Sequence, residues 1–301
     1  MSPEHKAAVT RPLDAAATSL MLLLCLVWGF NQVVIKLAIP DVPPLIQAAI
    51  RSAFAALLVA AWASSRGETL TARDRTLLPG VAAGVLFGIE FLLIYRGLLW
   101  TSASRAALFI YTAPFFVVLG SRWFLPGDRF APAQWLGLVL SFAGIVVAFG
   151  FPAPSGNPHE LLGDLMELAA GAAWGATTLI MKASVLARAP FEKVLLYQLG
   201  VSAPLLAAGA LFFGETVTGM PSGLTLASIA YQIVIISSAS YLAWFALIQR
   251  YSASRLSAFT FLTPLFGVAA GHFALGEPIT PAFALAVTLV IGGLFLVNRP
   301  K

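Results

Sequence analysis

Ten long apolar segments occupy most of the 301 residues of this chain. Each is close to the roughly 20 residues that an α-helix needs to cross a bilayer. The apolar residues run continuously instead of alternating with polar ones, which favours helices over strands. The segments are 17–38, 43–64, 77–99, 103–124, 132–150, 161–185, 193–213, 224–247, 254–275 and 280–298. We therefore predict an all-α polytopic membrane protein with ten transmembrane helices.

Composition excludes several other classes of protein. Hydrophobic residues make up 59% of the chain and charged residues only 10%, whereas about 25% of the residues in a soluble domain are charged. A soluble enzyme, a nucleic-acid-binding protein and a disordered protein are therefore not expected. The single cysteine, Cys25, excludes an internal disulfide. His5, His159 and His272 are far apart in sequence, so we predict no metal site, and no motif indicates a cofactor.

The basic residues indicate how the chain is oriented. Cytoplasmic loops of membrane proteins are rich in Lys and Arg, and the termini and alternate loops of this chain hold thirteen such residues. They are Lys6, Arg11, Arg66, Arg73, Arg75, Arg122, Arg129, Arg188, Lys193, Arg250, Arg255, Arg299 and Lys301. Only Arg96 and Arg105 lie near a loop on the opposite side. We predict that both termini are cytoplasmic and that the protein lies in a cell membrane, as a multi-pass protein of the bacterial inner membrane.

The two halves of the chain repeat one pattern. The repeated elements are Trp28-Gly29 before Lys36 and Trp174-Gly175 before Lys182, Ser102–Arg105 and Ser252–Arg255, and Pro114 and Pro264. These matches predict a cytoplasmic tail over 1–16, a first five-helix repeat over 17–150 and a second over 161–298. Because five is odd, the second repeat inserts upside down. Inverted repeats are characteristic of secondary transporters; a duplicated scaffold without a transport role is the alternative.

At these residues the chain resembles the drug/metabolite transporter superfamily in its EamA branch, and most of all the YddG-type amino-acid exporters. The resemblance covers nearly the whole chain. It implies that Glu90, Tyr111 and Trp174 lie near a central cavity. Ile89 and Ala113 stand where exporters of aromatic amino acids have Tyr and Trp, which implies a roomier, less selective pocket.

Glu90 lies deep inside the third apolar segment, where acidic side chains are rare and usually functional. It is a candidate for contact with a substrate amine or for a protonation switch. The alternative is a structural ion pair with Arg51, because the opposed directions of the second and third segments bring the two residues to a similar depth.

Four residues are candidates for gates or hinges. Lys36 and Lys182 lie near opposite membrane faces, where each either extends to the interface or acts as an electrostatic gate. Pro114 and Pro264 lie near the middle of their segments, and each removes a backbone hydrogen bond. They are interpreted either as packing kinks or as paired hinges that line the cavity.

Further pathway candidates are aromatic or polar. Trp28 and Trp174 lie away from the ends of their segments, so interfacial anchoring explains them poorly; they serve either packing or a cavity wall. Polar groups at this depth usually face the bundle interior. The remaining candidates are Tyr111 and Phe261, three residues before the two prolines, together with Asn31 and Gln198.

The leading hypothesis is an exporter of small metabolites, most of all amino acids with broad specificity, that works by alternating access. Its expected partners are the small-molecule substrate and the lipid bilayer, and no nucleic acid is expected. The sequence does not decide between proton coupling and facilitated diffusion, and it does not indicate the oligomeric state. Efflux of hydrophobic or cationic drugs is the alternative. A membrane scaffold leaves the duplication unexplained, and an intramembrane enzyme is disfavoured because the chain has no G-x-S-x-G, H-E-x-x-H or P-loop motif.

Overall fold

The computed structural model describes residues 13–68, 70, 74–125, 127–150, 157–276 and 281–299. Most of the predicted tail and the basic residues Lys6, Arg11, Arg73 and Lys301 lie outside the described residues. The α-helices are α1 (Ala15–Ala38), α2 (Pro44–Ser65), α3 (Leu77–Gly97), α4 (Ala103–Ile110), α5 (Ala113–Phe124), α6 (Pro132–Phe149), α7 (Glu160–Ala183), α8 (Phe191–Phe212), α9 (Gly223–Tyr231), α10 (Tyr241–Arg250), α11 (Ala253–Phe259), α12 (Leu262–Leu275) and α13 (Ala282–Asn298). A 3₁₀-helix, η1 (Val185–Arg188), and a π-helix, η2 (Gln232–Ser240), complete the described elements.

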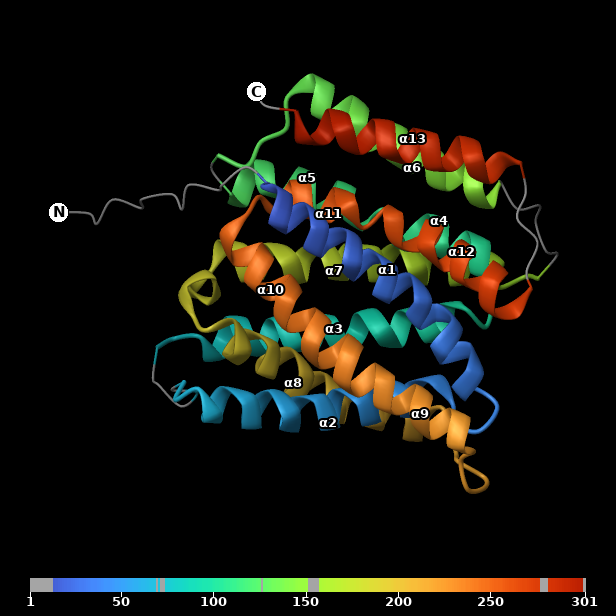
Figure 1. The fold of residues 1–301 in the computed structure, drawn as a ribbon. Helices are drawn as coiled ribbons and strands as arrows, with labels where there is room; N and C mark the ends of the chain where they lie inside the picture. The colour runs from blue at the N-terminus through green and yellow to red at the C-terminus, as the bar shows by residue number, and fades with distance from the viewer. Residues whose placement is uncertain are drawn as a thin grey trace.

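Eight helical segments of the described chain are long and apolar enough to span a membrane, and α13 is a shorter apolar helix. The sixth predicted span, α7, is less apolar than the others because its first two turns carry Glu160, Asp164 and Glu167. The count of ten spans stays a prediction. Helix α1 begins and helix α13 ends at the same end of the molecule, at the left in Figure 1.

Large apolar side chains cover the outside of the bundle. Leu78, Leu211, Phe212 and Phe273 are each at least 80% exposed. An apolar outer surface of this extent is unfavourable in water and fits immersion in lipid.

The repeated Ser-Ala-Ser-Arg motif has a local structural role. Ser102 and Ser252 are the N-caps of α4 and α11, and each hydroxyl accepts a hydrogen bond from the backbone N–H three residues later, at 3.2 and 3.1 Å. Such a bond satisfies one of the free N–H groups at a helix start. The motif therefore begins a helix in each half of the chain.

Two close helix pairs form opposite sides of the bundle, with α6 against α13 and α2 against α8 (Figure 1). Glycines allow these approaches. A Cβ atom on Gly137 would stand 2.5 Å from the carbonyl oxygen of Gly293. The stripe of Gly80, Gly84 and Gly88 brings α3 against α8, where an added Cβ on Gly80 would overlap the Tyr197 ring.

Helices α1 and α7 are exchanged between the two halves. From the first half of the sequence, α1 packs mainly on α12, α9 and η2 of the second half. From the second half, α7 packs mainly on α3, α4 and α5 of the first half. Each half of the structure therefore contains one helix from the other half of the sequence.

Three predicted spans are interrupted. The span over 103–124 breaks after Ile110, and the span over 254–275 breaks after Phe259, each just before its proline. Proline at the start of the next helix has no N–H to satisfy, so Pro114 and Pro264 are tolerated there. The span over 224–247 is not one regular α-helix, because η2 lies between α9 and α10.

Candidate functional site

Arg51 on α2 is the most deeply buried arginine of the described chain, with 2% of its surface exposed. Its guanidinium carbon lies 4.2 Å from the centre of the Phe91 ring, a cation–π contact. The Nε and Nη2 atoms are buried and have no hydrogen-bond partner among the described residues. An arginine enclosed in this way leaves two strong donors aimed into the protein interior.

Glu90 on α3 is 7% exposed and lies close enough to Arg51 for their charges to interact. No ion pair closes between the two side chains in the described part of the chain. The structural ion pair considered from the sequence is therefore not formed in this conformation. The guanidinium group of Arg51 and the carboxyl group of Glu90 share one region of the interior and remain separate.

Aromatic side chains surround this charged pair. The Phe87 ring packs edge-on against Phe91 at 5.0 Å and against Tyr241 of α10 at 5.8 Å. The ring of Tyr95 also lies beside Phe91, with ring centres 6.1 Å apart. Arg51 and Glu90 therefore lie in a mainly apolar environment, where the low dielectric constant strengthens electrostatic interactions.

The other predicted aromatic residues fall into two groups. Tyr111, at the α4–α5 break, meets Trp174 of α7 with ring centres 6.3 Å apart. Trp28 donates from Nε1 to Ser240 Oγ at 2.9 Å and packs edge-on against Trp244 at 5.5 Å. Trp28, Tyr111 and Trp174 are each only partly buried. The structure thus brings the rings of Tyr111 and Trp174 into contact and places Trp28 against η2 and α10.

Phe261 differs from Tyr111, its counterpart in the first half. It is fully buried, and its ring lies 6.4 Å from that of Phe115 and 6.3 Å from that of Phe142. In this conformation Phe261 is enclosed within a cluster of three rings.

The remaining candidates have varied surroundings. Lys182 donates to the carbonyl oxygens of Ile248, Gln249 and Tyr251, so it caps the end of α10. Lys36 is exposed. Gln198 donates to the sulfur of Met181 at 3.0 Å, and the buried Oδ1 atom of Asn31 has no partner among the described residues.

The two ends of the molecule differ in how tightly equivalent segments are enclosed. Between Ser252 and Leu265 every residue except Arg255 is buried, whereas most residues of the equivalent segment 102–115 are partly exposed. Asp128 accepts from Ser252 Oγ at 2.5 Å and from the backbone N–H of Ser254 at 3.2 Å, which holds the start of α11 to the loop after α5.

An ionic cluster holds α4 to α7 at the opposite end. Arg105 binds both carboxylate oxygens of Asp164, and its Nη1 lies 3.4 Å from Glu160 Oε1. Thr101 Oγ1 also donates to Asp164 at 2.6 Å. We call Thr101, Arg105, Glu160 and Asp164 the outer latch, since the orientation predicted from the basic residues has this end outside the cell.

Comparison with known proteins shows the family. The model of the EamA-like transporter family matches residues 16–150 and again residues 161–299. The chain belongs to the EamA-like transporter family. A relative from Escherichia coli strain K12, named a probable amino-acid metabolite efflux pump, is 26% identical over 92% of this chain and 93% of its own length.

Two further matches agree with this assignment. The Escherichia coli K12 protein named uncharacterized inner membrane transporter YedA is 24% identical over 92% of this chain and 89% of its own. A solved structure titled "Crystal structure of protein" has the same fold, with a TM-score of 0.78 and 23% identity over 94% of this chain and 96% of that one. Together with the apolar helices, the family identifies a multi-pass transporter of the inner membrane.

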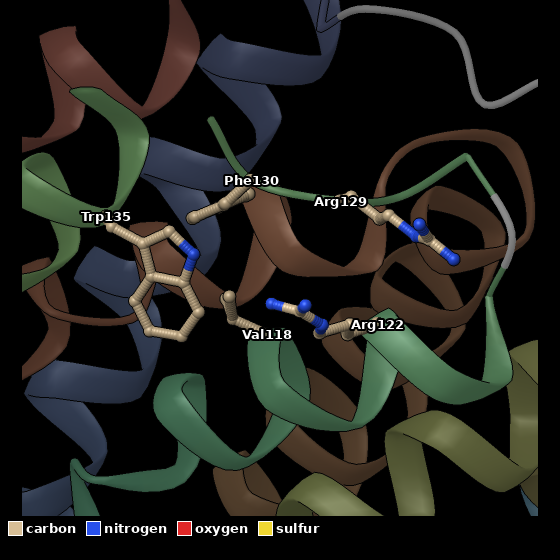
Figure 2. A pocket seen from close by; sticks show the side chains of 5 residues that line it. All are labelled: Val118, Arg122, Arg129, Phe130 and Trp135. Atoms are coloured by element: carbon tan, nitrogen blue, oxygen red, sulfur yellow. The ribbon is translucent and has the colours of Figure 1, made fainter. Parts of the chain in front are cut away.

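The transporter also has a pocket that the sequence analysis missed. Figure 2 shows Val118 and Arg122 of α5, Arg129 and Phe130 of the following loop, and Trp135 of α6 around a cavity of about 180 Å³. It is smaller than the roughly 300 Å³ typical of drug-sized ligands. The sequence signal was present: two arginines of the basic 4–5 loop, Arg122 and Arg129, precede the aromatic pair Phe130 and Trp135. The charge of this loop was interpreted only as a sign of orientation.

The π-helix η2 is a second feature that the sequence did not predict. Its first residue, Gln232, donates a hydrogen bond to Gln47 Oε1 of α2 at 2.9 Å, and the hydroxyl of its last residue, Ser240, accepts one from the indole N–H of Trp28. Ser237 Oγ is buried without a partner among the described residues. Irregular π-turns are often found at functional sites. The run Ser237-Ser238-Ala239-Ser240 was the available signal.

Proposed function

We propose that this protein is an exporter of amino acids and related small zwitterions that works by alternating access between its two halves. The observation that carries this proposal is the buried pair Arg51 and Glu90, which lie near each other without forming an ion pair. A zwitterion carries the two complementary charges on one small molecule.

Arg51 is assigned to the substrate carboxylate. A guanidinium matches a carboxylate in a two-point, charge-assisted geometry. Its free Nε and Nη2 atoms offer this pair of donors. Burying a charge without a partner costs several kcal/mol, so a ligand that supplies the partner is stabilised strongly.

Glu90 is assigned to the substrate ammonium group, and the rings of Phe87, Phe91 and Tyr241 to its side chain. Rings pack against apolar side chains of many shapes, which fits broad specificity. Efflux of a purely cationic drug uses Glu90 and the rings but leaves Arg51 as a repulsive charge. The buried arginine therefore favours zwitterions over cations.

The conformation described here is assigned to the outward-facing state. The buried segment 252–265 and the Asp128 contacts close the end that carries the basic loops, whereas segment 102–115 is partly exposed toward the other end. Export then requires the closed end to open and accept cargo from the cytoplasm. The pocket of Arg122 and Arg129 lies at that end and is assigned to attracting the carboxylate of incoming cargo (Figure 2).

The test is uptake of labelled amino acids into proteoliposomes, with and without an imposed pH gradient, compared with uptake of the amines that lack the carboxylate. We expect R51Q to lower kcat/KM for amino acids about 10- to 100-fold, the loss expected for a buried hydrogen bond to a charged group. It should not lower uptake of the amines. The matched control R66Q removes an exposed arginine beyond α2 and should leave both unchanged. Equal preference for amino acids over amines in the wild type and R51Q refutes the assignment.

A further inference from the structure

Glu167 on α7 is a second buried acid that the proposed substrate site does not use. The residue has no exposed surface, and neither Oε1 nor Oε2 has a hydrogen-bond partner among the described residues. It faces α3 where that helix has no side chain: a Cβ atom on Gly97 would stand 2.8 Å from Glu167 Oε1. The carboxyl group is therefore enclosed at a close contact between two helices.

The charged groups around Glu167 are already engaged or face elsewhere. Asp164, one turn earlier on α7, is held by Arg105 and Thr101 of the outer latch, and Glu160 is paired with Arg105. Beside Gly97, Arg96 directs its guanidinium over the Phe213 ring, 3.8 Å from the ring centre. No described cation is within ion-pair distance of Glu167.

An ionised carboxylate in this place has neither donors nor a cation to replace the water it loses, and it meets the negative charge of Asp164 one turn away. Protonation removes both penalties. We propose that Glu167 is a proton-binding site, which holds its proton while Arg105 holds Asp164 and exchanges it with the outer solution when the outer latch opens within the outward-facing state.

The position of Glu167 gives this proton a direction of travel. Glu90 and Gly97 are seven residues apart on α3, which is nearly two turns, so they share a face of that helix. Glu167 meets Gly97 at the outer end of this face, and Glu90 lies nearer the middle. Three acids thus follow one seam from the outer latch inward: Asp164, Glu167 and Glu90. The use of this proton in transport rests on the proposed function, but its binding does not.

Infrared difference spectroscopy of the purified full-length protein tests proton binding directly. The spectrum of the wild type minus E167Q at neutral pH should show the carbonyl stretch of a protonated acid. The matched control, wild type minus E160Q, should show the bands of a carboxylate, because Glu160 is paired with Arg105. Carboxylate bands in the E167Q difference spectrum overturn the proposal.

A second variant tests the surroundings of the site. D164N removes the neighbouring negative charge, so Glu167 should release its proton more easily, and the midpoint of its carbonyl band should fall by about one pH unit. An unchanged or raised midpoint contradicts the proposed link to the outer latch.

Transport measurements separate this proposal from the proposed function. In proteoliposomes, E167Q should abolish the effect of a pH gradient on amino-acid uptake, while E68Q, a change in the loop after α2 and outside the outer latch, should retain a gradient effect. An unaltered gradient effect in E167Q overturns the role of this proton in transport. Absence of amino-acid uptake by folded wild-type protein refutes the proposed function instead, and the infrared result still decides whether Glu167 binds a proton.

Discussion

The crossing of α1 and α12 gives a sharp prediction for Gly29. A Cβ atom at this position would stand 2.7 Å from the backbone nitrogen of Gly267, 2.7 Å from the carbonyl oxygen of Thr263 and 2.8 Å from the Cβ of Phe266. Ordinary contacts begin near 3.4 Å. The two helices must therefore separate by about 0.7 Å, because the obstructing atoms are mostly backbone and cannot rotate away.

The expected magnitude follows from two opposing effects. Overpacking of this kind costs about 1–3 kcal/mol, and replacing a helical glycine by alanine returns about 0.5–1 kcal/mol. We expect G29A to lower the free energy of unfolding by about 1–2 kcal/mol. For a chain of this size that corresponds to a fall in Tm of about 2–3 °C.

Thermal unfolding of the detergent-purified protein, followed by loss of the monodisperse species, measures this effect. Gly200 on α8 is the matched control, because nothing lies within 4 Å of an added Cβ there. G200A should leave Tm unchanged or raise it slightly. Equal Tm values for G29A and G200A would refute the reasoning that the α1–α12 distance is fixed by this contact.

Three other predictions concern transport and topology. E90Q should lower kcat/KM for amino-acid uptake at least 10-fold and flatten its pH dependence; unchanged kinetics at every pH would remove Glu90 from the mechanism. P114A and P264A should each slow turnover more than they weaken substrate binding, because each restores a continuous helix at a break; normal turnover in both would leave the prolines as packing kinks. In a P158C variant, the new thiol should react with an impermeant reagent from outside the cell, since the native Cys25 is buried; reaction only from the cytoplasm would reverse the topology.

Regular features of the fold could be predicted from the sequence. The first two apolar segments, predicted at 17–38 and 43–64, agree within two residues with α1 and α2. This succeeds because bilayer thickness and backbone hydrogen bonding leave few alternatives for a long apolar segment. The breaks before Pro114 and Pro264 follow from the same local chemistry.

Features that depend on tertiary contacts could not be predicted. The π-helix η2 lies in a segment that reads as ordinary apolar helix, and its irregular turns meet α1 and α2 from elsewhere in the chain. Arg51 and Glu90 were placed at a common depth, but depth alone does not tell whether two charges touch. Phe261 and Tyr111 are equivalent in sequence, yet only one is fully enclosed, because a single conformation breaks the symmetry of the repeats.

The exchange of α1 and α7 between the two halves affects how the chain is made. When the first half of the chain, α1 to α6, has left the ribosome, α1 has none of its main partners, since α9, η2 and α12 are still to be synthesised. The groove on α3, α4 and α5 that receives α7 is equally empty at that stage. Neither half can complete its packing during synthesis, so the final assembly step must join both halves at once, and a chain that stops early leaves two unpaired surfaces for membrane quality control to detect.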